Sequence, residues 1–87
     1  MEYNSLIERE IERDPRQPGP ANARLRRSGV PVWAIVGYYL DAVECDEPAV
    51  AHAYDVSLDA VRAAMQFYDL HRAEIDGRRE DNRSVVG

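Results

Sequence analysis

The hydrophobic pattern is most regular between Val56 and Ile75, where apolar residues recur at spacings of three, four and seven. Such spacing places side chains on one face of an α-helix. Ser57 has a side chain suited to an N-cap, and Asp59 lies in the first turn, where the helix dipole favours a negative charge. Gly77 predicts the end of this helix. The predicted apolar stripe consists of Leu58, Val61, Met65, Tyr68 and Ile75.

A shorter helix is predicted immediately before it, over the segment DEPAVAHAY. Asp46 is a suitable N-cap, and Pro48 fits the first turn because its missing N–H needs no partner there. Only about Asp55 and Val56 separate this helix from the next one. Two helices joined so tightly predict a helix-turn-helix unit, and an ordinary helical hairpin in a small bundle fits the spacing equally well.

The segment after Pro31, VWAIVGYYLDAVE, predicts a third helix whose apolar residues cover most of its circumference. Such a helix is either central to the core or shared with a second subunit. Gly37 inside it would permit close approach of another backbone. We therefore expect a homodimer interface here, formed by Val32, Trp33, Val36, Tyr39 and Leu40.

The first 29 residues predict an arm with short strands rather than a helical core. A short helix is expected over residues 5–10, followed by an extended segment at 11–13. Three prolines and a glycine in residues 14–20 exclude regular structure there. Leu25 lies between two arginines in a segment typical of a strand, and Ser28-Gly29 predicts a turn.

The fold class predicted from these patterns is mainly α, in one domain of 87 residues. Its parts are the arm at 1–29, a helix-turn-helix core of three helices at 30–76, and a flexible tail at 77–87 that carries few apolar residues. A chain this short buries a limited core, which favours a homodimer.

The charge of the chain is −5, from 16 acidic residues against 11 basic ones, and every basic residue is arginine. This is the wrong sign for a domain whose main task is to hold phosphates, although local patches matter more than the sum. No apolar run reaches the length of a membrane span, so we expect no membrane contact. The single cysteine, Cys45, excludes an internal disulfide, which predicts a reduced cytoplasmic setting and a buried or half-buried thiol.

Catalytic chemistry is poorly represented in the sequence, which has two histidines, one cysteine and no glycine-rich phosphate loop. His71 and Glu74 are three residues apart on one predicted helix face, but a metal site needs more converging ligands. Capping explains Ser57 without a nucleophilic role. We expect no enzyme, no catalytic residue, no metal and no cofactor.

DNA binding would use the exposed residues at the start of the second helix of the pair. These are Ser57, Asp59, Arg62 and Gln66. Of these four residues, Asp59 carries the wrong charge for contacts with phosphates. A basic cluster in the arm, formed by Arg24, Arg26 and Arg27, would add phosphate contacts. The alternative interpretation of that cluster is a solvated strand edge protected by charge.

The two runs GVPVWAIVGYYLDAV and AVAHAYDVSLDAVRAAMQFYDLHRAEID, preceded by RDP at 13–15 and by ARLRRSG, carry a family resemblance. Together, over roughly residues 11–82, they resemble the bacterial family named domain of unknown function 433, whose members are described as VapB-type antitoxins. The chain departs from the family pattern at the triplet Arg27-Ser28-Gly29, where members carry glycine-threonine-arginine. It departs again at ECDEP, where members carry a glycine and a serine.

The resemblance implies a winged-helix-like helix-turn-helix fold after short strands, and a partner toxin with a PIN-like nuclease fold. Such a nuclease holds its metal with carboxylates, and an inserted arginine would pair with them. The candidate toxin-binding residues are Arg78, Arg79 and Arg83, in the predicted tail. The expected function is that of a type II toxin-antitoxin antitoxin that neutralises the toxin and binds operator DNA to autoregulate its promoter. The alternative is a non-catalytic dimeric protein-interaction module without DNA binding.

Overall fold

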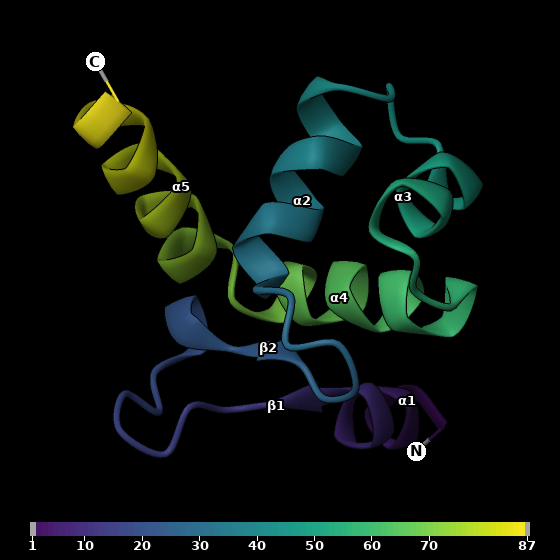
Figure 1. Ribbon diagram of the computed structural model, residues 1–87. Coiled ribbons are helices and arrows are strands. Elements are labelled where there is room, and N and C mark those ends of the chain that lie inside the picture. Colours follow the sequence, from purple (N-terminus) through teal and green to yellow (C-terminus); the bar gives the residue numbers. More distant parts are fainter. Residues whose placement is uncertain (1, 87) are drawn as a thin grey trace.

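The chain folds mainly into helices, which confirms the predicted class (Figure 1). The computed structural model describes the backbone of residues 2–86 and the side chains of residues 5–81. Within that range the five α-helices are α1 (Glu2–Glu10), α2 (Val32–Asp41), α3 (Glu47–Tyr54), α4 (Leu58–Leu70) and α5 (Arg72–Val86). A short 3-10 helix, η1 (Pro20–Asn22), and two strands, β1 (Ile11–Glu12) and β2 (Arg24–Leu25), complete the described elements.

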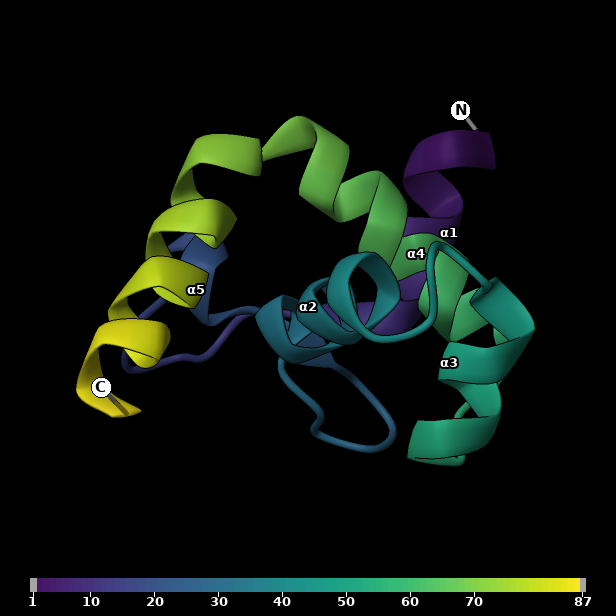
Figure 2. The same ribbon diagram turned by 90° about the horizontal axis from the view of Figure 1, so that it is seen from above.

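The helix α4 is the centre of the fold, because α1, α2 and α3 all pack against it (Figures 1 and 2). The buried face of α4 includes three alanines, whose small side chains let neighbouring helices approach closely. Its N-cap is Ser57, whose Oγ accepts a hydrogen bond of 3.0 Å from the Ala60 N–H, as the sequence predicts. The buried residues of α4 are Ala60, Val61, Ala63, Ala64, Phe67 and Tyr68.

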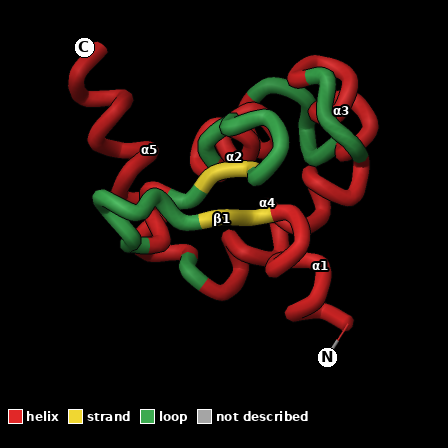
Figure 3. Tube along the Cα trace, turned by 60° about the horizontal axis from the view of Figure 1, so that its bottom comes forward, coloured by secondary structure: helices red, strands yellow, loops and turns green. Residues whose placement is uncertain are grey.

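The two strands of the arm form an antiparallel pair in which Ile11 lies opposite Leu25 (Figure 3). Both side chains are buried, at 4% and 1% exposure, so this small sheet contributes to the core. The turn predicted at Ser28-Gly29 is confirmed. Gly29 adopts a φ of +78°, which favours glycine, and its N–H donates to the Leu25 carbonyl at 2.8 Å.

The connection between α3 and α4 is short because each of its ends has a defined cap. The Asp46 side chain accepts a hydrogen bond from the Ala49 N–H at 3.2 Å and begins α3. Asp55 ends α3 in the left-handed conformation, at φ 55° and ψ 49°, which aspartate tolerates better than most residues. Only Val56 then separates it from the Ser57 cap. The predicted pair of tightly joined helices is therefore present.

The single helix predicted from Val56 to Ile75 is wrong, because the chain leaves helical geometry at His71. His71 has φ −132° and ψ 41°, and its ring packs against Phe67 with 4.6 Å between the ring centroids. The chain bends there, and α5 packs against α2 and η1. Ile75 is fully buried in α5.

The predicted helix end at Gly77 is also wrong, and so is the absence of regular structure in the predicted tail. Gly77 lies inside α5, which continues to Val86. A glycine in a helix interior costs about 1 kcal/mol relative to alanine. The burial of Ile75 in the preceding turn offsets that penalty, because burying a large aliphatic side chain contributes about 1.5–3 kcal/mol.

The helix α2 is more deeply buried than an intersubunit helix would be. Val32, Ile35 and Val36 have no exposed surface within the single chain. Val32 and Val36 are therefore removed from the predicted dimer interface, because their side chains are already covered by the protomer itself. Trp33 and Tyr39 are half-buried, and Leu40 is 37% exposed.

Cys45 lies in the loop between α2 and α3, where its thiol is exposed, so the predicted burial of this residue is wrong. Glu44 and Cys45 both adopt positive φ values, 52° and 66°, which turn the chain sharply from α2 into α3. Within the described residues, no helix has both the length and the apolar character needed to cross a bilayer.

Candidate functional site

The exposed face of α4 is the surface on which the predicted DNA-reading residues would act. It consists of the exposed residues Asp59, Arg62 and Asp69 and the half-buried Gln66, and their spacing of three, four and three places them on one side of the helix. The side chains of Asp59, Arg62 and Asp69 are 57%, 53% and 63% exposed. Ser57 does not belong to this face, because its hydroxyl oxygen is engaged as the cap of the helix.

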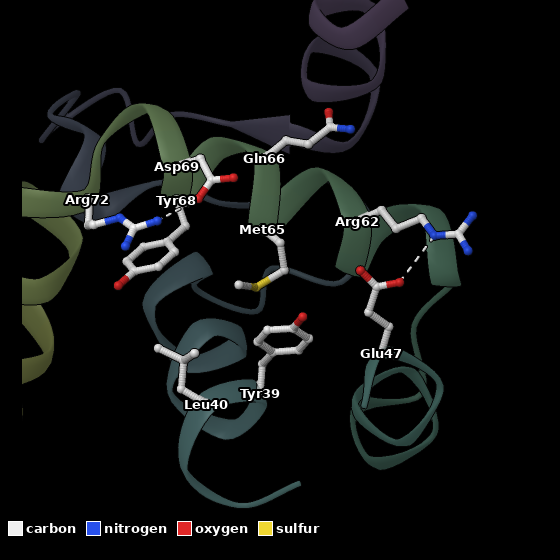
Figure 4. A pocket seen from close by; sticks show the side chains of 9 residues that line it. All are labelled: Tyr39, Leu40, Glu47, Arg62, Met65, Gln66, Tyr68, Asp69 and Arg72. Atoms are coloured by element: carbon white, nitrogen blue, oxygen red, sulfur yellow. Dashed lines mark hydrogen bonds and ion pairs between the residues drawn. The ribbon is translucent and has the colours of Figure 1, made fainter. Parts of the chain in front are cut away.

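A groove of about 660 Å³ runs beside this face, between α2, α3 and α4 (Figure 4). Its middle is apolar and is formed by Tyr39 and Leu40 of α2 together with Met65 of α4. Burial is the main cause that raises the pKa of Tyr39 above its ordinary value. The complete lining is Tyr39, Leu40, Glu47, Arg62, Met65, Gln66, Tyr68, Asp69 and Arg72.

Each end of the groove carries an ion pair. At one end, Arg62 Nε lies 3.3 Å from a carboxylate oxygen of Glu47. At the other end, an Arg72 Nη atom lies 2.9 Å from a carboxylate oxygen of Asp69 (Figure 4). The groove therefore has an apolar middle with one positive and one negative group at each end.

The charge of the α3–α4 unit is strongly negative. Residues 46–70 contain five acidic residues against one arginine, a net charge of −4. That arginine, Arg62, is paired with Glu47. The face that would approach DNA therefore has little positive potential to offer to phosphates.

The basic cluster of the arm is largely engaged within the chain. Arg24 Nε donates to a carboxylate oxygen of Glu12 at 2.7 Å, and this hydrogen bond is the main cause that raises the pKa of Arg24. Arg26 donates to the carbonyls of Glu8 and Ile11, both at 3.0 Å, and lies 3.7 Å from the same Glu12 carboxylate. These contacts hold β1 and β2 together and favour the interpretation of the cluster as a charged strand edge.

Arg27 is exposed, as is Arg26, but it lines a different part of the surface. It lines a cavity of about 310 Å³ together with Ser57, Asp55 and the buried carboxylate of Glu10. The structure thus brings Arg27 close to the start of α4, and two acidic side chains lie beside it.

The arginines predicted to contact a toxin are also part of the fold. Arg79 has only 15% of its side chain exposed and forms ion pairs with Asp41 of α2 and Asp76 of α5. Arg78 is half-buried on the same helix. The side chain of Arg83 lies outside the residues whose side chains the structure describes.

The side chains of residues 5–81 contain no group of three or more His, Cys, Asp or Glu residues that could hold a metal ion. His71 packs against Phe67, and the Tyr68 hydroxyl donates to Asp76 at 2.9 Å. Burial, together with this hydrogen bond, raises the pKa of Tyr68.

Sequence reasoning missed the groove, because its lining comes from four helices and from residues as distant as Tyr39 and Arg72. The available signal was the position of Met65 and Leu40 at the edges of their apolar stripes. Comparison of the chain with protein-family models, with curated proteins and with solved structures gives no match.

Proposed function

We propose that this chain is a non-catalytic protein-interaction module of the antitoxin type, and that it acts by binding a protein partner rather than by reading DNA. The observation that carries this choice is the charge of the α3–α4 unit, which is −4 with its single arginine already paired. Proteins that bind duplex DNA depend on phosphate contacts for most of their affinity. A negative recognition surface opposes those contacts.

The arm gives DNA binding little further support. Arg24 and Arg26 share the Glu12 carboxylate, so their charge is partly neutralised within the sheet. The resemblance implies a winged-helix-like arrangement, in which a hairpin beside the recognition helix also contacts the duplex. The two strands here lie between α1 and α2, ahead of the α3–α4 pair, and each is two residues long. We therefore regard operator binding and promoter autoregulation as the weaker part of the expected function.

The antitoxin part of the proposal rests on the resemblance to domain of unknown function 433, with a PIN-like nuclease toxin as the partner in the bacterial cytoplasm. The acidic chain suits a basic partner, since opposite charges speed association and oppose wrong pairings. The candidate contacts are the predicted toxin-binding arginines Arg78, Arg79 and Arg83. Arg79 would first have to leave two carboxylates.

Two measurements test this proposal on the purified chain. The first is the light-scattering mass of the chain mixed with the product of the gene adjacent to its own, where we expect a stable mixed complex. The second is a gel shift with duplex DNA from its promoter at 50 and 200 mM salt, where we expect no strong, salt-sensitive shift. A chain that ignores its neighbour and shifts the promoter DNA with a steep salt dependence would overturn the proposal.

A further inference from the structure

We infer that the exposed face of α4, with the groove beside it, binds a second copy of this chain in an antiparallel helix pair. The two-fold axis of this pair passes between Met65 and Gln66. This interface shares Tyr39 and Leu40 with the α2 interface that the sequence predicts, but it is centred on α4. It does not depend on the proposed function, because it concerns contacts between identical chains only.

The exposed charges alternate in sign along α4 and into α5. From the start of the exposed face to the first residue of α5 the order is Asp59, Arg62, Gln66, Asp69 and Arg72. An antiparallel copy centred between Met65 and Gln66 places Arg62 opposite Asp69 of the other copy. The same register places Asp59 opposite Arg72. By symmetry each contact occurs twice, so four pairs of opposite charges face one another across the axis.

The side chains that make these contacts are accessible. The exposures of Asp59, Arg62, Asp69 and Arg72 lie between 53% and 63%, and Asp59 also forms an ion pair with Arg9 of α1 at 3.3 Å. Arg62 and Asp69 are seven residues apart, which is about 10 Å along a helix axis. The two Arg62–Asp69 contacts therefore fit within one helix–helix contact around the axis, and the Asp59–Arg72 contacts lie at its ends, where the chain bends at His71.

The groove supplies the apolar surface that such a contact needs. Leu40 is one of the two large hydrophobic side chains exposed among the described residues, and it lines the groove with Tyr39 and Met65 (Figure 4). The charged ends of the groove obey the same symmetry. The Arg62–Glu47 end of one copy meets the Asp69–Arg72 end of the other, so that Glu47 also faces an arginine.

The charges select the direction of the pair. In a parallel, in-register arrangement, Asp59, Arg62 and Asp69 would each face their own copy, and like charges would repel at every position. Like-charge contacts across an interface are strongly unfavourable. The charge order therefore favours the antiparallel pair, and the DNA-facing side of α4 would be covered in the dimer.

A charge-swap mixing experiment tests this inference, using sedimentation equilibrium of the full chain. The unaltered chain should be a dimer. Arg62→Asp alone places Asp against Asp69 twice, and Asp69→Arg alone places Arg against Arg62 twice. We expect each variant alone to show a dimer Kd raised about a hundredfold. An equimolar mixture should recover the dimer, because every facing pair in the mixed dimer is again opposite in charge.

The mixture separates this interface from a simple loss of stability. Each substitution also breaks an ion pair inside its own chain, with Glu47 or with Arg72, and mixing cannot repair that defect. Arg16→Asp, an exposed site in the proline-rich loop, makes the same charge change as Arg62→Asp away from α4 and should leave the dimer intact. Circular dichroism of every variant confirms that it is folded.

A disulfide cross-link gives a second measurement, and it is used also if either charge variant fails to fold. Gln66→Cys in a Cys45→Ser background places a thiol beside the proposed axis and should give a covalent dimer on mild oxidation. Arg16→Cys in the same background should not. Three results would overturn the inference: an unaltered chain that is monomeric, single variants that remain dimers, or a mixture that stays monomeric. Absence of the Gln66→Cys cross-link in a demonstrated dimer would also overturn it.

Discussion

The guanidinium of Arg79 on α5 donates a hydrogen bond of 2.9 Å to the carboxylate of Asp41, at the end of α2. A second bond of 3.2 Å joins the same guanidinium to Asp76, one turn earlier on α5. Asp76 in turn accepts a hydrogen bond from the Tyr68 hydroxyl of α4. This chain of contacts ties α5 to both α2 and α4, so residues that the sequence assigns to a tail are part of the folded domain.

Arg79→Ala should therefore destabilise the fold by about 1 kcal/mol, because it removes a mostly buried guanidinium from two carboxylates. Urea unfolding followed by circular dichroism measures this difference. Arg16→Ala, at an exposed site in the proline-rich loop, is the matched control and should change stability by less than about 0.5 kcal/mol. Equal effects of the two substitutions would show that Arg79 does not anchor α5.

Gly37→Ala should stabilise the chain by about 0.5–1 kcal/mol, because glycine in a helix interior loses more conformational entropy than alanine. The sequence predicts a close backbone approach at Gly37, but a Cβ there would meet only Arg79 Nε, at 3.6 Å. That distance is an ordinary van der Waals contact. Thermal unfolding measures the change.

Gly29→Ala is the opposing control for that substitution. Space is also available at Gly29, since no atom lies within 4 Å of a Cβ built there. Its φ of +78° strains any L side chain, so alanine should destabilise the chain by about 1 kcal/mol. A destabilising Gly37→Ala would mean that α2 and α5 pack more tightly than this geometry indicates.

Ser57→Ala should cost about 1 kcal/mol, because the Ser57 Oγ accepts the hydrogen bond from the Ala60 N–H that caps α4. Ser57→Asp should retain most of the stability, since aspartate is an equally good N-cap and its charge suits the helix dipole. Chemical denaturation of the three proteins measures both effects. If alanine is tolerated as well as aspartate, capping does not explain this serine.

Stability should fall as the pH rises above about 10, the ordinary pKa of tyrosine in an unfolded chain. Burial raises the pKa of both Tyr68 and Tyr39 in the folded state, so folding favours their neutral forms. Their contribution is present in full below the unfolded pKa and is lost as the pH passes through the raised one. Urea unfolding between pH 9 and 11 measures the slope.

Phenylalanine variants test the source of that slope. Tyr68→Phe should give a shallower decline above pH 10, and it should also lose about 1 kcal/mol at neutral pH, because the hydrogen bond to Asp76 is removed. Tyr39→Phe should also make the decline of stability above pH 10 shallower. It leaves the hydrogen bond between Tyr68 and Asp76 in place. A double variant that declines as steeply as the unaltered chain would assign the pH dependence to other groups.

Local signals predicted the starts of the helices well, because a cap acts within three residues of itself. Asp46 and Ser57 were recognisable from their types and positions, and both accept the predicted backbone hydrogen bonds. The prolines of residues 14–20 and the turn at Gly29 likewise act on their immediate neighbours. The extended segment at 11–13 and Leu25 between two arginines indicated the two strands, but the pairing between them was not predicted.

The candidate sites were predicted less well, because a side chain's role depends on partners far away in the sequence. Arg24 was a candidate phosphate contact until the fold placed Glu12 beside it. Arg62 was a candidate base contact, and in the structure it forms an ion pair with Glu47 of α3. In both cases the sequence showed the charge of the arginine, and the tertiary structure showed the carboxylate that pairs with it.

The sequence by itself determined the helical class, the caps of α3 and α4, and the acidic balance of the chain. These follow from residue types and short spacings, which act through local sterics and hydrogen bonds. Only the tertiary structure decided that the chain bends at His71, between α4 and α5. The bend at His71 places Ile75 in the core and Arg79 beside Asp41, 38 residues away in the sequence. The burial of Ile75 outweighs the local penalty of Gly77, and no local pattern indicates the contact between Arg79 and Asp41.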